Sequence, residues 1–217
     1  MKNAFTVSTR SNRLWQTNQM KDPNEIFAFV MKNLAPFSDV ELEVFFKTLF
    51  QESFKPGEFY VQIGEKSDKV GFVLSGLFKT YALSHEGAKH ILNFCEEGFF
   101  IGSLASLITN LPSHVSIEAI EPSVVFSTSY SNLANLYKTS LNWQQFGRKI
   151  AEKLYLEREQ REYEALALSA EERWNRLLER YPNIDKRVSQ GELAVAIGIT
   201  PTSLSRLLKK SKKVVIG

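Results

Sequence analysis

A stretch of about twenty residues beginning at Ser189 constrains the fold most, because it carries the start and stop signals of two short helices. Ser189 and Glu192 have the spacing of a capping box, in which each side chain satisfies a free backbone N–H at a helix start. Gly198 stands where that helix must end, since glycine adopts the left-handed conformation without a Cβ penalty. Thr200 and Pro201 suit the N-cap and the first position of a second helix. We predict two short helices joined by a three-residue turn.

Helix pairs with such a turn are typical of the helix-turn-helix, whose second helix lies in the DNA major groove. Ala194 is small where the two helices must approach closely, and Ile199 fills the turn. The outward positions of the second helix are polar and include no acid. A helical hairpin without a ligand is the alternative. The residues that we expect to contact DNA are Ser189, Gln190, Thr200, Thr202, Ser203, Ser205, Arg206, Lys209 and Lys210.

Basic residues are concentrated at this same C-terminal end of the chain. Residues 168–217 carry ten Lys and Arg against five Asp and Glu, a net +5. The rest of the 217 residues carries seventeen against nineteen, a net −2. A local basic excess is expected of a surface that contacts phosphates.

Composition excludes several classes of protein. The single cysteine, Cys95, excludes an internal disulfide framework and a multi-cysteine metal site. The first twenty residues lack the apolar segment of a secretory signal, and no apolar run is long enough to span a membrane. We therefore expect a cytoplasmic protein with no membrane association, no metal and no cofactor.

The segment between residues 54 and 130 has a different pattern. Short β-type runs occur at 59–61, 70–74, 78–83, 91–94, 115–120 and 124–128, separated by Gly-containing turns. Such spacing indicates an antiparallel roll or barrel, with one short helix near 102–107. Before it we expect two helices, from 24 to 34 and from 39 to about 50. A repeating face marked by Phe146, Ile150 and Leu154 then predicts a long helix over 141–168, which we interpret as a connector and a dimer seam. A solvated connector alone is the alternative.

This arrangement resembles the transcription regulators related to the cyclic-AMP receptor protein and the fumarate–nitrate regulator, the Crp/Fnr family. The residues that carry the resemblance are the glycines Gly64, Gly76 and Gly98, the run 98–102, and the segments 191–194 and 204–206. It implies an α+β chain with a jelly-roll of the cyclic-nucleotide-binding type, a dimerisation helix and a winged-helix-like C-terminal helix-turn-helix. The implied domains are a mobile arm (1–24), an effector roll (25–140), the long helix (141–168) and a DNA-binding domain (169–217).

The resemblance also implies a function and partners. Such regulators are homodimers that bind palindromic double-stranded DNA and respond to a small molecule, and RNA polymerase is a further candidate partner. Cyclic-nucleotide binders of the family hold the ribose with a Glu and the cyclic phosphate with an Arg. Here Ser103 stands at the Glu position, and Ser113 and His114 stand where the Arg-Ser pair is expected. A buried phosphate without its bidentate Arg is strongly penalised, so we expect no tight cyclic AMP binding. The effector-pocket candidates are Gly102, Ser103, Leu104, Ser113 and His114.

In the second helix, the family's base-reading positions fall on Pro201, Thr202 and Arg206, and only Arg206 has the guanidinium suited to guanine. The residues after the helix suffice for one strand, which implies a short wing at most. A sensor module for a cyclic nucleotide or another metabolite, with secondary or lost DNA binding, is the alternative function. An enzyme is not expected, because the three histidines form no recognisable catalytic motif.

Overall fold

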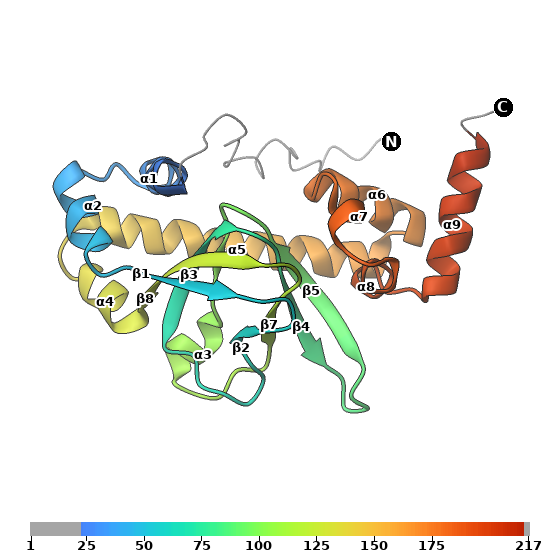
Figure 1. The fold of residues 1–217 in the computed structure, drawn as a ribbon, viewed down its shortest axis with the longest axis horizontal. Helices are drawn as coiled ribbons and strands as arrows, with labels where there is room; N and C mark the ends of the chain where they lie inside the picture. The colour runs from blue at the N-terminus through green and yellow to red at the C-terminus, as the bar shows by residue number, and fades with distance from the viewer. Residues whose placement is uncertain (1–22, 215–217) are drawn as a thin grey trace.

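The computed structural model describes residues 23–214, and its centre is a sandwich of two antiparallel four-stranded sheets (Figure 1). The first sheet has the strand order β1-β8-β3-β6 and the second has the order β2-β7-β4-β5. The strands are β1 Phe50–Phe54, β2 Phe59–Val61, β3 Lys69–Ser75, β4 Phe78–Leu83, β5 Lys89–Cys95, β6 Phe100–Ile101, β7 Ser116–Ala119 and β8 Ser123–Ser129.

Helices surround this roll on both sides. The helix α5 runs along the length of the molecule, with α1 and α2 near one end and α6 to α9 at the other (Figure 1). The helices are α1 Pro23–Leu34, α2 Asp39–Phe46, α3 Leu104–Thr109, α4 Tyr130–Leu136, α5 Leu141–Ala167, α6 Ala170–Arg180, α7 Ile184–Arg187, α8 Gln190–Ala196 and α9 Pro201–Val214. Among the described residues, no helix has both the length and the apolar character that a membrane span requires.

The register of β3 and β8 divides their side chains between two cores. Phe72 lies opposite Phe126, and Val73 lies opposite Val125. Because successive strand residues point to opposite faces, the two phenylalanines face outward and the two valines face the second sheet. Val73 and Val125 are fully buried in the core between the sheets.

The outer face of the first sheet is covered by α1, α2 and the start of α5. Phe27 packs on Phe72 with ring centroids 4.7 Å apart, and Trp143 of α5 packs on Phe45 of α2 at 4.8 Å. All four rings belong to one buried cluster. Burial of rings of this size fixes the first turns of α5 on the roll.

The outer face of the second sheet is covered by α6, α7 and α8. Leu77 and Phe94 of the roll share a buried cluster with Trp174, Leu193 and Ala194. The C-terminal helices are therefore packed against the roll as well as joined to it through α5.

Several elements differ from the sequence-based prediction. The second helix ends at Phe46 instead of continuing to about residue 50, and residues 50–54 form β1. The Thr48 hydroxyl explains the early end: it lies 2.8 Å from the Phe45 carbonyl and 3.0 Å from the Thr128 hydroxyl of β8, so the chain turns into the sheet. The short elements β6, α4 and α7 were not predicted.

The C-terminal tail also differs. The prediction of a strand after the second helix of the pair is wrong within the described residues, because α9 continues to Val214. Between Lys210 and Val214 the sequence has no Gly or Pro that would end a helix there. The predicted arm at 1–24 lies outside the described residues except for its last two, which begin α1.

Candidate nucleic-acid interface and effector cassette

The helices α8 and α9 meet as the sequence predicted. The Ser189 hydroxyl caps α8 by accepting from the Glu192 N–H, and Gly198 turns the chain with φ of 70°. The Thr200 hydroxyl caps α9 by accepting from the Ser203 N–H at 3.2 Å. Ala194 and Leu204 are fully buried, so the small residue and the leucine anchor the two helices together.

The outer face of α9 is polar, basic and open to solvent. Arg206 is exposed and lies two residues after Leu204, which is buried beneath the helix. No Asp or Glu occurs between Pro201 and Val214. Of the predicted DNA contacts, Ser205 is half-buried, and those exposed are Ser189, Gln190, Thr200, Thr202, Ser203, Arg206, Lys209 and Lys210. The structure therefore brings these side chains to the surface around one helix pair.

A residue that sequence reasoning missed ties this pair to the end of α5. The Arg173 guanidinium donates from Nε to the Ile197 carbonyl at 2.8 Å and from an Nη to the Leu168 carbonyl at 2.6 Å. Ile197 is the C-cap of α8, and Leu168 is the C-cap of α5. One side chain thus satisfies carbonyls at two helix ends that lack intrahelical partners. No local pattern in the sequence indicates this contact, because its two acceptors are backbone groups.

The predicted effector residues lie around α3, but their polar groups are already bonded. Ser113 donates to the Ser103 hydroxyl at 2.9 Å, and both side chains are buried. The Ser113 hydroxyl also accepts from the Val115 N–H. Ser106 accepts from the Ser67 N–H. These partners are other hydroxyls and backbone groups, so none supplies the positive charge that a buried phosphate requires.

The remaining effector-pocket candidates do not supply that charge either. Gly102 and Leu104 are half-buried at the start of α3. His114 is exposed, whereas its neighbour Ser113 is buried, so the imidazole does not converge with the two serine hydroxyls.

The interior of the roll is filled by its own side chains. Tyr60 is buried, and its hydroxyl lies 3.2 Å from the Ser127 hydroxyl. Burial raises the pKa of the Tyr60 phenol, while the Ser127 hydrogen bond acts in the opposite direction. Lys69 lies over the Tyr60 ring and pairs with Glu52 at 2.5 Å. The phenol therefore remains neutral and serves as a packed polar group of the core.

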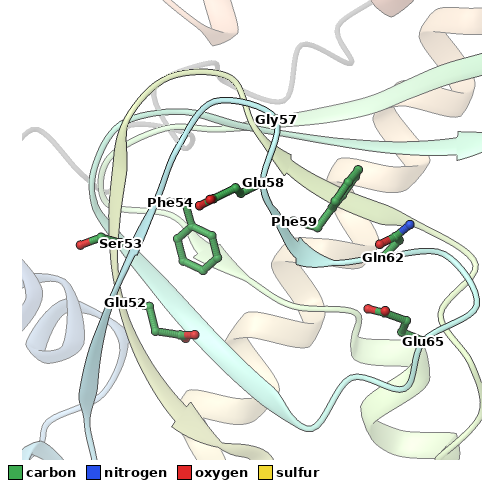
Figure 2. A pocket seen from close by; sticks show the side chains of 8 residues that line it. All are labelled: Glu52, Ser53, Phe54, Gly57, Glu58, Phe59, Gln62 and Glu65. Carbon is green, nitrogen blue, oxygen red and sulfur yellow. The ribbon is translucent and has the colours of Figure 1, made fainter.

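A hollow of about 690 Å³ opens on the roll surface beside β1 and β2 (Figure 2). Three of its lining residues are carboxylates, Glu52, Glu58 and Glu65, and none is Lys or Arg. Phe54 and Phe59 supply its apolar surface. An acidic lining disfavours a phosphate, so this hollow does not replace the missing phosphate site.

Comparison with known proteins agrees with this architecture. Residues 51–140 match the family of the cyclic nucleotide-binding domain. The c-di-GMP responsive global regulator CLP of Xanthomonas campestris is similar over 81% of this chain and 92% of its own, with 20% identity and a TM-score of 0.65. FixK2 of Bradyrhizobium japonicum is similar over 77% and 86%, with the same identity and TM-score. No curated protein matches the sequence.

A third structure carries the family name. A Eubacterium rectale protein described as a transcriptional regulator of the Crp/Fnr family is similar over 82% of this chain and 84% of its own, with 16% identity and a TM-score of 0.65. The class of protein is thus an α+β chain with a cyclic nucleotide-binding domain and a long helix. The resemblance seen in the sequence is confirmed: this chain shares the fold of the Crp/Fnr regulators.

Proposed function

We propose that this protein is a homodimeric, sequence-specific DNA-binding transcription regulator. The observation that carries the proposal is the outer face of α9, where Arg206 is exposed on an acid-free helix that Leu204 anchors from beneath. In a helix-turn-helix, such a face enters the major groove, and a guanidinium pairs with the O6 and N7 atoms of guanine. Lys209 and Lys210, one turn further along, are placed for phosphate contacts.

The surface of α5 supports the dimer. After Leu154, which is 41% exposed, four more exposed apolar side chains follow along the second half of α5: Tyr155, Leu156, Tyr163 and Leu166, with exposed fractions of 67, 57, 55 and 84%. At about 100° per residue these four fall on one face of the helix. An apolar stripe of this kind on a 27-residue helix is the surface that a second copy would cover. Two copies joined along α5 would present two α9 helices to successive major grooves about 34 Å apart.

The roll is proposed as a domain that does not bind cyclic AMP tightly. The Ser103 and Ser113 hydroxyls bond to each other, and Tyr60 belongs to the buried core between the sheets. We keep the division into an effector roll over 25–140, a dimerisation helix over 141–168 and a DNA-binding domain over 169–217.

Selection of bound fragments from random double-stranded DNA tests the proposal. We expect a two-fold symmetric site whose half-sites are one helical turn apart, and we expect Arg206→Ala to weaken its recognition. A parent chain that enriches no sequence, yet binds a metabolite tightly, would instead support a sensor without DNA binding.

A further inference from the structure

The helix α8 begins with a capping pattern that is only half used. The chain contains three Ser-x-x-Glu starts, and in α2 and α6 the Glu returns to the N-cap backbone: Glu41 to Ser38 and Glu172 to Ser169. In α8 the Ser189 hydroxyl accepts from the Glu192 N–H, but the Glu192 carboxylate accepts from the Ser189 hydroxyl at 3.2 Å and from Nζ of Lys79 at 2.6 Å instead of from the N-cap backbone. A residue whose local role is to cap the helix is therefore bonded to the roll.

Lys79 lies in the middle of the sheet face that α8 covers. In the register of the second sheet it is opposite Phe94 of β5 and Glu118 of β7, so the three side chains share the outer face. Lys79 is only 7% exposed, and Nζ lies 2.8 Å from Oε1 of Glu118. Burial works to lower the pKa of Lys79, but the hydrogen bonds that Lys79 donates to Glu118 and Glu192, with the charges of these carboxylates, outweigh it and raise that pKa. Lys79 is thus a buried, charged bridge between the two domains.

The same interface contains apolar and charged contacts on either side of this bridge. Phe94 meets Tyr181 edge to face, with ring centroids 5.7 Å apart. Arg187 of α7 forms a bidentate pair with Glu97, at 2.9 and 3.0 Å, and lies 2.5 Å from Glu121. These contacts supply area and attraction. The buried Lys79–Glu192 pair also constrains the orientation of α8, because a movement that separated the two charges would leave one of them unpaired in the interior.

We propose that Lys79, a residue of the roll, is a positioning residue for DNA recognition: through Glu192 it fixes α8, and with α8 the recognition helix α9, in one orientation. The expected effect on DNA recognition rests on the proposed function, whereas the expected effect on the orientation of α8 does not. The link from α8 to α9 is short and rigid, because the Ile199 N–H bonds to the Ala194 carbonyl at 2.9 Å and both helices share a buried core.

The orientation is measured without DNA. Spin labels at Glu86→Cys, in the exposed β4–β5 turn, and Asn175→Cys, on the exposed face of α6, report the distance between the roll and α6, which shares a buried cluster with α8. The native Cys95 is buried and is not labelled. Labelled chains are mixed with excess unlabelled chains so that only distances within one subunit are recorded. We expect one narrow distance distribution in the parent, a broad one in Lys79→Met and Glu192→Gln, and a narrow one again in Lys79→Arg.

A matched control separates this bridge from a general loss of charge. Lys89 also pairs with Glu118, at 3.5 Å, but its side chain is 52% exposed and lies over the ring of Tyr81, another residue of the roll. Lys89→Met should therefore leave the distribution narrow. Glu192→Gln removes only the contact to α8 and keeps Lys79 paired with Glu118. The proposal can therefore still be tested if Lys79→Met fails to fold.

DNA binding supplies the second measurement. We expect the parent to prefer one half-site spacing by about tenfold over a site lengthened by half a helical turn, and the two bridge variants to discriminate less than about twofold. Preference for bases within a half-site should persist in those variants. Distances that stay narrow in both bridge variants overturn the proposal whatever the DNA result. A parent that binds no specific DNA overturns the proposed function. The distance measurement uses no DNA, so it tests the role of Lys79 in orientation separately from that function.

Discussion

Gly71 of β3 lies directly beneath the ring of Tyr60 of β2, so that a Cβ on Gly71 would meet the Tyr60 hydroxyl at 2.8 Å and Val125 Cγ1 at 2.6 Å. Both contacts are closer than side-chain atoms tolerate, and Val125 is a fully buried residue that cannot move outward. The side chains of Tyr60 and Val125 therefore fill the interior of the roll at this point.

Gly71→Ala should lower the free energy of unfolding by about 1–3 kcal/mol, the usual cost of overfilling a core. Urea unfolding followed by far-ultraviolet circular dichroism measures it. Gly191→Ala in α8 is the matched control, because its added Cβ would meet only the Ser189 hydroxyl at 3.9 Å. That variant should be as stable as the parent or slightly more so. Equal stability of the two variants would contradict a closed roll interior.

Cyclic AMP at millimolar concentration should not stabilise the protein against heat. A ligand with a dissociation constant of about 10 µM would add roughly 2.7 kcal/mol at a hundredfold excess, which a melting curve detects readily. We expect no such shift, because the Ser103 and Ser113 hydroxyls already bond to each other. A melting temperature that rises with cyclic AMP would contradict our interpretation of the effector-pocket residues.

Arg206→Ala should cost about 1–3 kcal/mol of DNA-binding free energy at one base pair of each half-site and relax the preference there. Lys209→Ala should weaken binding to all sequences alike and reduce the salt slope by about one. Fluorescence anisotropy with matched and mismatched duplexes at several salt concentrations separates the two effects. The assignment of Arg206 as a base reader fails if its substitution leaves base preference unchanged.

The sequence predicted those elements whose signals are local. Ser189, Gly198 and Thr200 mark helix ends by their own hydrogen bonds and backbone conformation: α8 begins after Ser189 and ends just before Gly198, and α9 begins after Thr200. The β4 strand, Phe78–Leu83, also agrees residue for residue with the predicted run. Local chemistry is sufficient to set such boundaries.

The features that were missed depend on residues far apart in the chain. Glu192 has the correct spacing for a capping box, but Lys79, 113 residues away, takes its carboxylate. Residues 50–54 became β1 because β8 offers a pairing edge, with Phe50 opposite Ser127. Arg173 bonds two carbonyls, which no residue pattern reveals. These features depend on contacts that exist only in the assembled fold, so no local sequence pattern indicates them.

Leu166→Glu on the exposed stripe of α5 should weaken self-association by tenfold or more, since a charge in an apolar seam loses solvation without gaining a partner. Analytical ultracentrifugation across a range of concentrations measures the change. Val40→Glu, at a residue 70% exposed on α2, adds the same charge away from the stripe and should have no effect. A parent chain that sediments as a monomer at every concentration would contradict the dimer.

Folding should become less favourable as the pH rises, because of Glu96 at the junction between the roll and α7. Burial, and then the charge of Glu97, raise the pKa of Glu96 from 4.5 to about 7, and Arg187 only partly opposes them. The Glu96 carboxylate lies 3.8 Å from Arg187, which is itself bonded to Glu97 and Glu121.

The sign follows from proton binding. Between about pH 4.5 and 7, the folded protein keeps the Glu96 proton that the unfolded chain has lost, so the free energy of unfolding falls as the pH rises through that window. Glu96→Gln should flatten this part of the profile and make the protein relatively more stable at pH 8. Glu86→Gln removes the same charge from the exposed β4–β5 turn and should leave the slope unchanged. Urea unfolding at pH 5, 6, 7 and 8 measures all three proteins, and parallel profiles for the parent and Glu96→Gln would show that Glu96 ionises as freely in the folded protein as in the unfolded chain.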